Sequence, residues 1–142
     1  GYFENGEGEL IDAASVLDWL QQYNKNSKKC WVVGFSFGAW VAMQLLMRRP
    51  EINGFVCVSP PASIRDFSFL APCPSSGLII HGDKDTIASY DSAKILSEKL
   101  QKQKKVDIVF RSIKGADHFY ENYKEEFFST VNNYVGNKLS KK

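Results

Sequence analysis

Four short runs of apolar, strand-forming residues constrain the fold of this chain more than any other feature. The first of these runs is continuous, which is typical of strands buried on both faces, as in a parallel sheet. Segments with helical periodicity alternate with them, which predicts an α/β fold with a mainly parallel sheet and flanking helices. We expect one domain over residues 1–142, with strands at Cys30–Phe35, Phe55–Val58, Leu78–Ile80 and Val106–Ile113.

The remaining segments predict helices and one long irregular connection. The expected helices are Glu9–Tyr23, Phe37–Arg49, Ser89–Gln101 and a final helix with Tyr120, Tyr123, Phe127, Val131 and Tyr134 on one face and Gly136 as its stop. The connection Ser59–Ser76 contains four prolines. A loop of this length either covers a site at the end of the preceding strand or is held by its own apolar side chains, Phe67, Phe69 and Leu70.

The charge balance and the cysteines argue against several other kinds of protein. Lys and Arg number 18 against 16 Asp and Glu, and the resulting net charge of +2 predicts no nucleic-acid or membrane partner. No stretch approaches the ~20 apolar residues of a membrane span. Three cysteines without a C-x-x-C spacing favour a reducing, cytoplasmic location over a disulfide scaffold. Two histidines without a metal-binding motif predict no metal and no other cofactor.

The motif that carries chemistry is Gly34-Phe35-Ser36-Phe37-Gly38, which fits G-x-S-x-G where a buried strand gives way to a helix. This context is that of a nucleophile elbow, in which a strained turn exposes the serine hydroxyl above the sheet. The two glycines are expected to let strand and helix approach closely. The Phe37 N–H at the helix start is the expected oxyanion-hole donor. The alternative is an ordinary turn in which Ser36 only caps the helix.

A serine hydroxyl is a weak nucleophile that needs a base, and the base needs an orienting carboxylate. In elbow architectures these residues follow the chain order Ser, Asp or Glu, His. Ser36, Asp85 and His118 satisfy this order, and each would lie just past the carboxyl end of a different strand. The other histidine, His81, would reverse the order, so we expect it to bond to backbone in a turn.

Two further aspartates compete with Asp85 for the role of the acid. Asp83 also follows Gly82, and we expect it to stabilise that turn by accepting from nearby backbone N–H groups. Asp117 directly precedes His118, but adjacent side chains rarely project the same way. Asp85 lies farther into its loop, so its carboxylate can turn back toward the neighbouring strand end.

With these motifs the chain resembles the α/β-hydrolase superfamily, most closely small bacterial hydrolases related to dienelactone hydrolases and carboxylesterases. The resembling segments are Gly34–Gly38, Ile80–Ile87 and Gly115–Phe119. The resemblance implies Ser36 as nucleophile, Asp85 as acid and His118 as base. Dienelactone hydrolases proper carry cysteine at the nucleophile position, so a serine there implies esterase-like chemistry on a small acyl or ester substrate.

The resemblance covers the second half of the superfamily's fold. Its members carry further strands upstream, and one oxyanion donor comes from a loop of that region. Without those strands, Cys30–Phe35 would be an apolar edge, through which we expect copies of the chain to associate. Two hypotheses follow: a serine hydrolase that cleaves an ester or related acyl bond, or a truncated, non-catalytic hydrolase that serves, if at all, as an interaction module.

Overall fold

The computed structural model describes residues 30–140, so the predicted helix Glu9–Tyr23 lies outside the described residues. The described elements are β1 (Trp31–Phe35), α2 (Phe37–Arg48), β2 (Gly54–Val58), β3 (Gly77–Gly82), α3 (Tyr90–Gln101), β4 (Ile108–Ile113) and α4 (Lys124–Ser140). All four predicted strands are present, and their boundaries differ from the predicted ones by a few residues at most.

The four strands form one parallel sheet whose spatial order, β1-β2-β3-β4, is also their order in the chain. Phe35 at the end of β1 lies opposite Val58 at the end of β2, and Val58 lies opposite Ile80 of β3. The carboxyl ends of the strands therefore meet along one side of the sheet, where functional groups gather in such folds. Within the described residues β1 is an edge strand, and its Val33 is 64% exposed.

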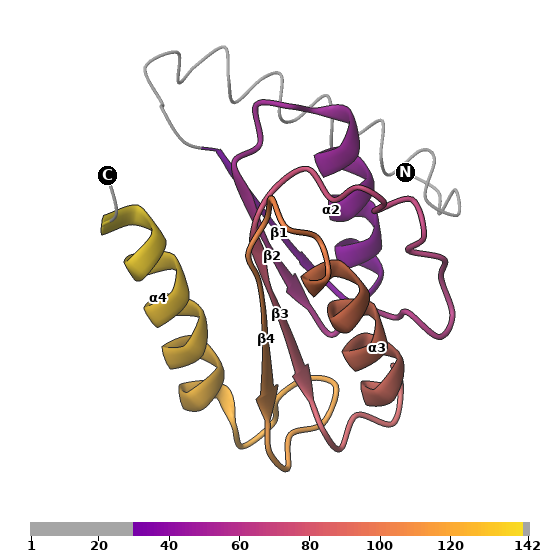
Figure 1. The fold of residues 1–142 in the computed structure, drawn as a ribbon. Helices are drawn as coiled ribbons and strands as arrows, with labels where there is room; N and C mark the ends of the chain where they lie inside the picture. The colour runs from indigo at the N-terminus through magenta and orange to yellow at the C-terminus, as the bar shows by residue number, and fades with distance from the viewer. Residues whose placement is uncertain (1–29, 141–142) are drawn as a thin grey trace, which may run out of the picture.

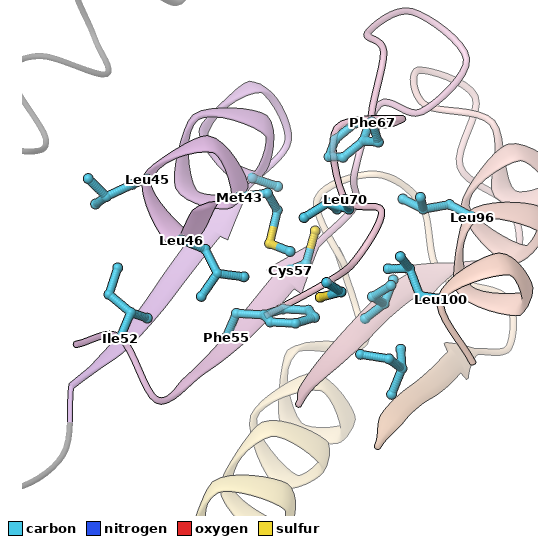
Figure 2. Packing of buried hydrophobic residues seen from close by; sticks show 14 of the residues in the cluster. Met43, Leu45, Leu46, Ile52, Phe55, Cys57, Phe67, Leu70, Leu96 and Leu100 are labelled. Atoms are coloured by element: carbon cyan, nitrogen blue, oxygen red, sulfur yellow. The ribbon is translucent and has the colours of Figure 1, made fainter. Parts of the chain in front are cut away.

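Helices cover both faces of the sheet, with α2 and α3 on one face and α4 on the other (Figure 1). Because successive side chains of a strand point to opposite faces, β2 contributes Phe55 and Cys57 to one core and Val56 and Val58 to the other. Every residue of β2 and β3 is buried, which explains their continuous apolar sequences. Figure 2 shows the core under α2 and α3, where Leu46 of α2 and Leu100 of α3 flank Phe55.

The long connection between β2 and β3 is held by its own side chains. Phe67 and Leu70 are buried in the core under α2 and α3, and Phe69 packs against it. The backbone carbonyl of Asp66 accepts a hydrogen bond from Trp40 Nε1 at 3.0 Å, which ties the segment to α2. Of the two interpretations of Ser59–Ser76, the structure supports a packed loop.

The prediction for the final helix was wrong at both ends. Tyr120 and Tyr123 precede α4, because Tyr120 (φ 57°) and Asn122 (φ 65°) have left-handed backbone conformations that an α-helix cannot contain. Both tyrosines nevertheless pack in the core under α4. Gly136 lies inside α4 and does not stop it. A glycine within a helix costs only about 1 kcal/mol relative to alanine, which packing of the apolar helix face offsets.

None of the helices in residues 30–140 combines the length and the apolar character that a membrane crossing requires.

Candidate active site

Ser36 lies on the sharp turn between β1 and α2. Its backbone is strained, with φ 56° and ψ −121°, and the turn is held by hydrogen bonds from the Ser36 N–H to the Val58 carbonyl (2.8 Å) and from the Ala39 N–H to the Ser36 carbonyl (2.9 Å). The Ser36 side chain makes no capping hydrogen bond to α2. The alternative role as a simple helix cap is therefore wrong, and the hydroxyl is directed elsewhere.

Only one of the two motif glycines is required for a close approach. A Cβ atom at Gly34 would lie 2.4 Å from the Gly38 carbonyl oxygen and 2.6 Å from the Ala39 Cα, so no side chain fits between β1 and the start of α2. A Cβ atom at Gly38 would meet no atom of residues 30–140 within 4 Å. The expectation that both glycines serve close packing is confirmed for Gly34 and wrong for Gly38.

His118 bridges Ser36 and Asp85. Its Nε2 lies 2.9 Å from Ser36 Oγ, and its Nδ1 lies 2.7 Å from Asp85 Oδ2. An ionised carboxylate can only accept, so Nδ1 carries the proton and Nε2 is left to accept from the Ser36 hydroxyl. The His118 residue is 3% exposed and the Asp85 side chain is fully buried, whereas Ser36 is only half-buried, so the hydroxyl end of this chain of contacts is the more accessible one.

The Asp85 carboxylate is surrounded by hydrogen-bond donors. Its Oδ1 accepts from the backbone N–H groups of Ile87 and Ala88, both at 2.8 Å. Its Oδ2 faces Nδ1 of His118 and also lies 3.1 Å from Nε2 of His81. Burying a carboxylate costs free energy unless donors replace the lost water, and here two backbone N–H groups and two imidazole nitrogens lie within 3.1 Å of its oxygens.

The loop that carries Asp85 is tied to the loop that carries His118. The Gly115 N–H donates to Asp83 Oδ1 at 2.6 Å, and the Lys84 N–H donates to the Ala116 carbonyl at 3.0 Å. A Cβ atom at Gly82 would lie 2.3 Å from that same carbonyl oxygen, so the two loops leave no room for one. Asp83 does bond to backbone, but the prediction that it stabilises its own turn was wrong, because its partner belongs to the next loop.

Asp117 does not contact the imidazole of its neighbour. Its Oδ1 accepts from the Glu121 N–H at 2.9 Å and so stabilises the turn that follows His118. As expected, the carboxylate adjacent in sequence points elsewhere, and Asp85 is the acidic side chain that reaches the imidazole.

A buried network that the sequence analysis missed holds the backbone of His118. The Ser59 hydroxyl lies 3.2 Å from the His118 carbonyl oxygen and 2.9 Å from Tyr120 Oη, and the Tyr120 hydroxyl donates to the Ile80 carbonyl at 3.2 Å. Burial raises the pKa of Tyr120, which keeps its hydroxyl protonated as a donor. The network anchors the His118 loop to the ends of β2 and β3. The sequence feature that could have indicated this network is the position of Ser59 directly after a buried strand.

His81 occupies the backbone-bonded position that was expected for it. Its Nε2 lies 2.9 Å from the Ala88 carbonyl oxygen, and its side chain is fully buried. Burial lowers the pKa of His81; the neighbouring Asp85 carboxylate partly counteracts this effect, and His118 adds to it. The folded protein therefore holds His81 as a neutral imidazole.

The lowered pKa of His81 predicts a loss of stability in acid. Below pH 6.5, its ordinary pKa, the unfolded chain binds a proton at His81 that the folded chain excludes, so the free energy of unfolding falls as the pH falls. Between pH 7 and pH 5.5 we expect the free energy of unfolding to fall more in the unmodified chain than in a variant without His81. Urea unfolding at both pH values, with the unmodified chain and with His81→Gln, measures how much free energy of unfolding each protein loses. Equal losses in the two proteins would contradict the prediction.

One surface groove lies away from these residues. Its volume is about 440 Å³, and it runs between α3 and the β2–β3 connection, where Arg65, Leu70, Leu96 and Lys99 line it. Ser36, Asp85 and His118 are not among its lining residues. Two exposed aromatic rings, Phe35 and Phe119, instead flank the His118 imidazole, with ring centroids 5.2 and 5.0 Å away.

Within residues 30–140 no group of three or more His, Cys, Asp or Glu side chains is placed to hold a metal ion.

A parallel sheet with helices on both faces, and a serine on the turn after a strand, place this chain in the class of α/β hydrolases. The sequence profile of the dienelactone hydrolase family matches residues 3–139, and the chain belongs to that family.

Comparisons with individual proteins agree with this assignment. An uncharacterized protein of Rickettsia prowazekii is 51% identical over 139 residues. A solved protein of unknown function from Agrobacterium tumefaciens is 52% identical, superposes with a TM-score of 0.95 and matches 98% of this chain. An α/β serine hydrolase without a lid from Xanthomonas campestris is 26% identical, with a TM-score of 0.88 over the whole chain.

The chain is shorter than these relatives. It spans 58% of the Rickettsia protein, 64% of the Agrobacterium chain and 62% of the Xanthomonas chain. It also covers 45% of a carboxymethylenebutenolidase homologue from Mus musculus, to which it is 28% identical.

Proposed function

We propose that this chain carries the nucleophile, base and acid of a serine hydrolase that cleaves a carboxylic ester or a related acyl bond. The observation that supports this proposal most is the bridging position of His118, with Nε2 2.9 Å from Ser36 Oγ and Nδ1 2.7 Å from Asp85 Oδ2. An acceptor nitrogen at hydrogen-bond distance from a strained serine is what nucleophilic catalysis of acyl transfer requires.

In the proposed reaction Ser36 Oγ attacks the carbonyl carbon of the ester while its proton passes to His118 Nε2. The imidazolium that forms is stabilised by the buried Asp85 carboxylate, and it then returns the proton to the leaving alcohol. The resulting acyl-enzyme is hydrolysed when a water molecule, deprotonated by the same nitrogen, attacks the acyl carbon and restores Ser36.

The negative charge that develops on the carbonyl oxygen needs donors fixed in advance. Phe37 is the first residue of α2, so we assign its N–H, at the positive end of the helix dipole, as one oxyanion donor. The exposed rings of Phe35 and Phe119 offer an apolar surface beside the imidazole, which favours esters with apolar groups over charged ones.

The proposal predicts covalent labelling by a fluorophosphonate, which reacts only with an activated serine. Intact mass spectrometry should show one adduct per chain, and peptide mapping should place it on Ser36. Ser36→Ala should remain unlabelled, whereas Ser63→Ala, which removes an exposed serine of the β2–β3 connection, should label as the unmodified chain does.

The contrary outcome favours the non-catalytic alternative. A chain with a folded far-UV circular dichroism spectrum and no adduct would show that Ser36 is not activated. The activity would then be absent from this chain, whatever its family.

A further inference from the structure

We propose that His81 is a positioning residue for the proposed triad: its Nε2–H donates to Asp85 Oδ2, the same oxygen that receives Nδ1–H of His118, and fixes the orientation of the carboxylate. This inference rests on the proposed function only for the role of Asp85. It assigns to the second histidine a task beyond the turn contact expected from its place in the sequence.

The position of the proton on His81 follows from its neighbours. Nε2 lies 2.9 Å from the Ala88 carbonyl oxygen and 3.1 Å from Asp85 Oδ2. A carbonyl oxygen can only accept, so Nε2 must carry the proton, and Asp85 Oδ2 is the second and more distant acceptor beside it. Nδ1 of His81 is buried and has no hydrogen-bond partner, so it is the unprotonated nitrogen of a neutral ring.

This arrangement leaves a buried acceptor unsatisfied, which costs free energy that a leucine or methionine would not incur. The contact that offsets this cost lies on the other side of the ring, where the Nε2–H group faces both the Ala88 carbonyl and the Asp85 carboxylate. His81 is the next-to-last residue of β3, and the ring of Tyr90 packs edge-on against it at 6.0 Å between centroids, so the imidazole has little freedom to turn away.

The way His81 affects the orientation of Asp85 follows from the partners of its two carboxylate oxygens. Two backbone N–H groups hold Oδ1, and two imidazoles hold Oδ2. If His81 no longer donates, His118 is the one partner of Oδ2 left among residues 30–140, and the carboxylate can tilt about its terminal torsion. The hydrogen bond that orients His118 toward Ser36 would then be longer and less directional.

A matched pair of substitutions isolates the N–H group. His81→Gln keeps an N–H donor at a similar reach, and His81→Met has the same side-chain length without a donor. The chain contains two histidines, so His118 is the only histidine in either variant. Its hydrogen-bonded Nδ1 proton can therefore be followed without ambiguity as a downfield signal in proton nuclear magnetic resonance.

We expect the unmodified chain and His81→Gln to show this downfield proton, and His81→Met to lose it through exchange with water. For an activated ester, kcat should fall about tenfold in His81→Met with KM unchanged, and should stay within about twofold in His81→Gln. A folded His81→Met chain that keeps both the signal and kcat would overturn the proposal. Equal losses in the two variants would also overturn it, because the N–H group would then not be the cause.

A measurement on the unmodified chain covers the case in which His81→Met does not fold. Nitrogen-15 chemical shifts should show His81 as a neutral ring protonated at Nε2, and a charged ring or the Nδ1–H tautomer would overturn the inference. These resonance measurements need no turnover. If Ser36 is not labelled by a fluorophosphonate, the proposed function fails, while the contact between His81 and Asp85 is still tested.

Discussion

Replacing Ser36 by alanine, His118 by alanine, or both together should lower kcat for an activated ester by about the same factor, on the order of 10⁶. The three variants are expected to be equivalent because the hydroxyl is nucleophilic only while Nε2 accepts its proton, and Nε2 has nothing to accept once the hydroxyl is gone. Removal of either group therefore removes the whole pathway. What remains is binding and the oxyanion donor.

Initial rates with a p-nitrophenyl ester, corrected for the uncatalysed reaction, measure these factors. Ser63→Ala serves as the control for preparation and folding, because its side chain lies on the exposed face of the β2–β3 connection. If the effects of Ser36→Ala and His118→Ala multiplied in the double variant, the two residues would act independently. The contact at 2.9 Å would then have no catalytic meaning.

Gly34→Ala should lower the free energy of unfolding by about 3 kcal/mol or more and abolish labelling of Ser36. The added Cβ would lie 2.4 Å from the Gly38 carbonyl oxygen and 2.6 Å from the Ala39 Cα, and both of these atoms belong to backbone. Since backbone cannot move aside as a flexible side chain can, β1 and α2 must separate. The strained turn between them would lose the support that holds Ser36 in place.

The second glycine of the motif supplies a matched control. Gly38 lies in α2, and a Cβ there meets no atom of the described part of the chain within 4 Å. Gly38→Ala should therefore raise the free energy of unfolding by up to about 1 kcal/mol and leave labelling intact. Urea titrations at neutral pH compare the two variants. A Gly34→Ala chain as stable as the unmodified one would show that strand and helix are not in close contact at this point.

The four strands could be predicted because each is rich in apolar, strand-forming residues, and β2 and β3 carry the longest buried runs since both of their faces are covered. The same runs located the loops in which Ser36, Asp85 and His118 were expected, and the structure brings these three side chains into contact. Their catalytic roles stay predictions. The contact of Asp83 could not be predicted, because its Oδ1 accepts a hydrogen bond from the Gly115 N–H, which belongs to another loop.

Other errors have local physical causes. The start of α4 was misplaced because Tyr120 and Tyr123 keep helical spacing with the later apolar residues, while the left-handed backbone at Tyr120 and Asn122 leaves no trace in that spacing. The network of Ser59 and Tyr120 was missed for a related reason. A buried hydroxyl pair depends on how two loops meet, and a single serine or tyrosine has no pattern that reports it.

The contact between Ser36 and His118 joins the two outermost described strands, since β1 and β4 lie at opposite edges of the sheet. It connects residues 82 positions apart in the chain, and contacts of such separation form late because their loop closure costs the most entropy. On the proposed function, Ser36 therefore meets its base only when β1 and β4 are both in place in the sheet, and a partly folded chain would carry a hydroxyl without that base.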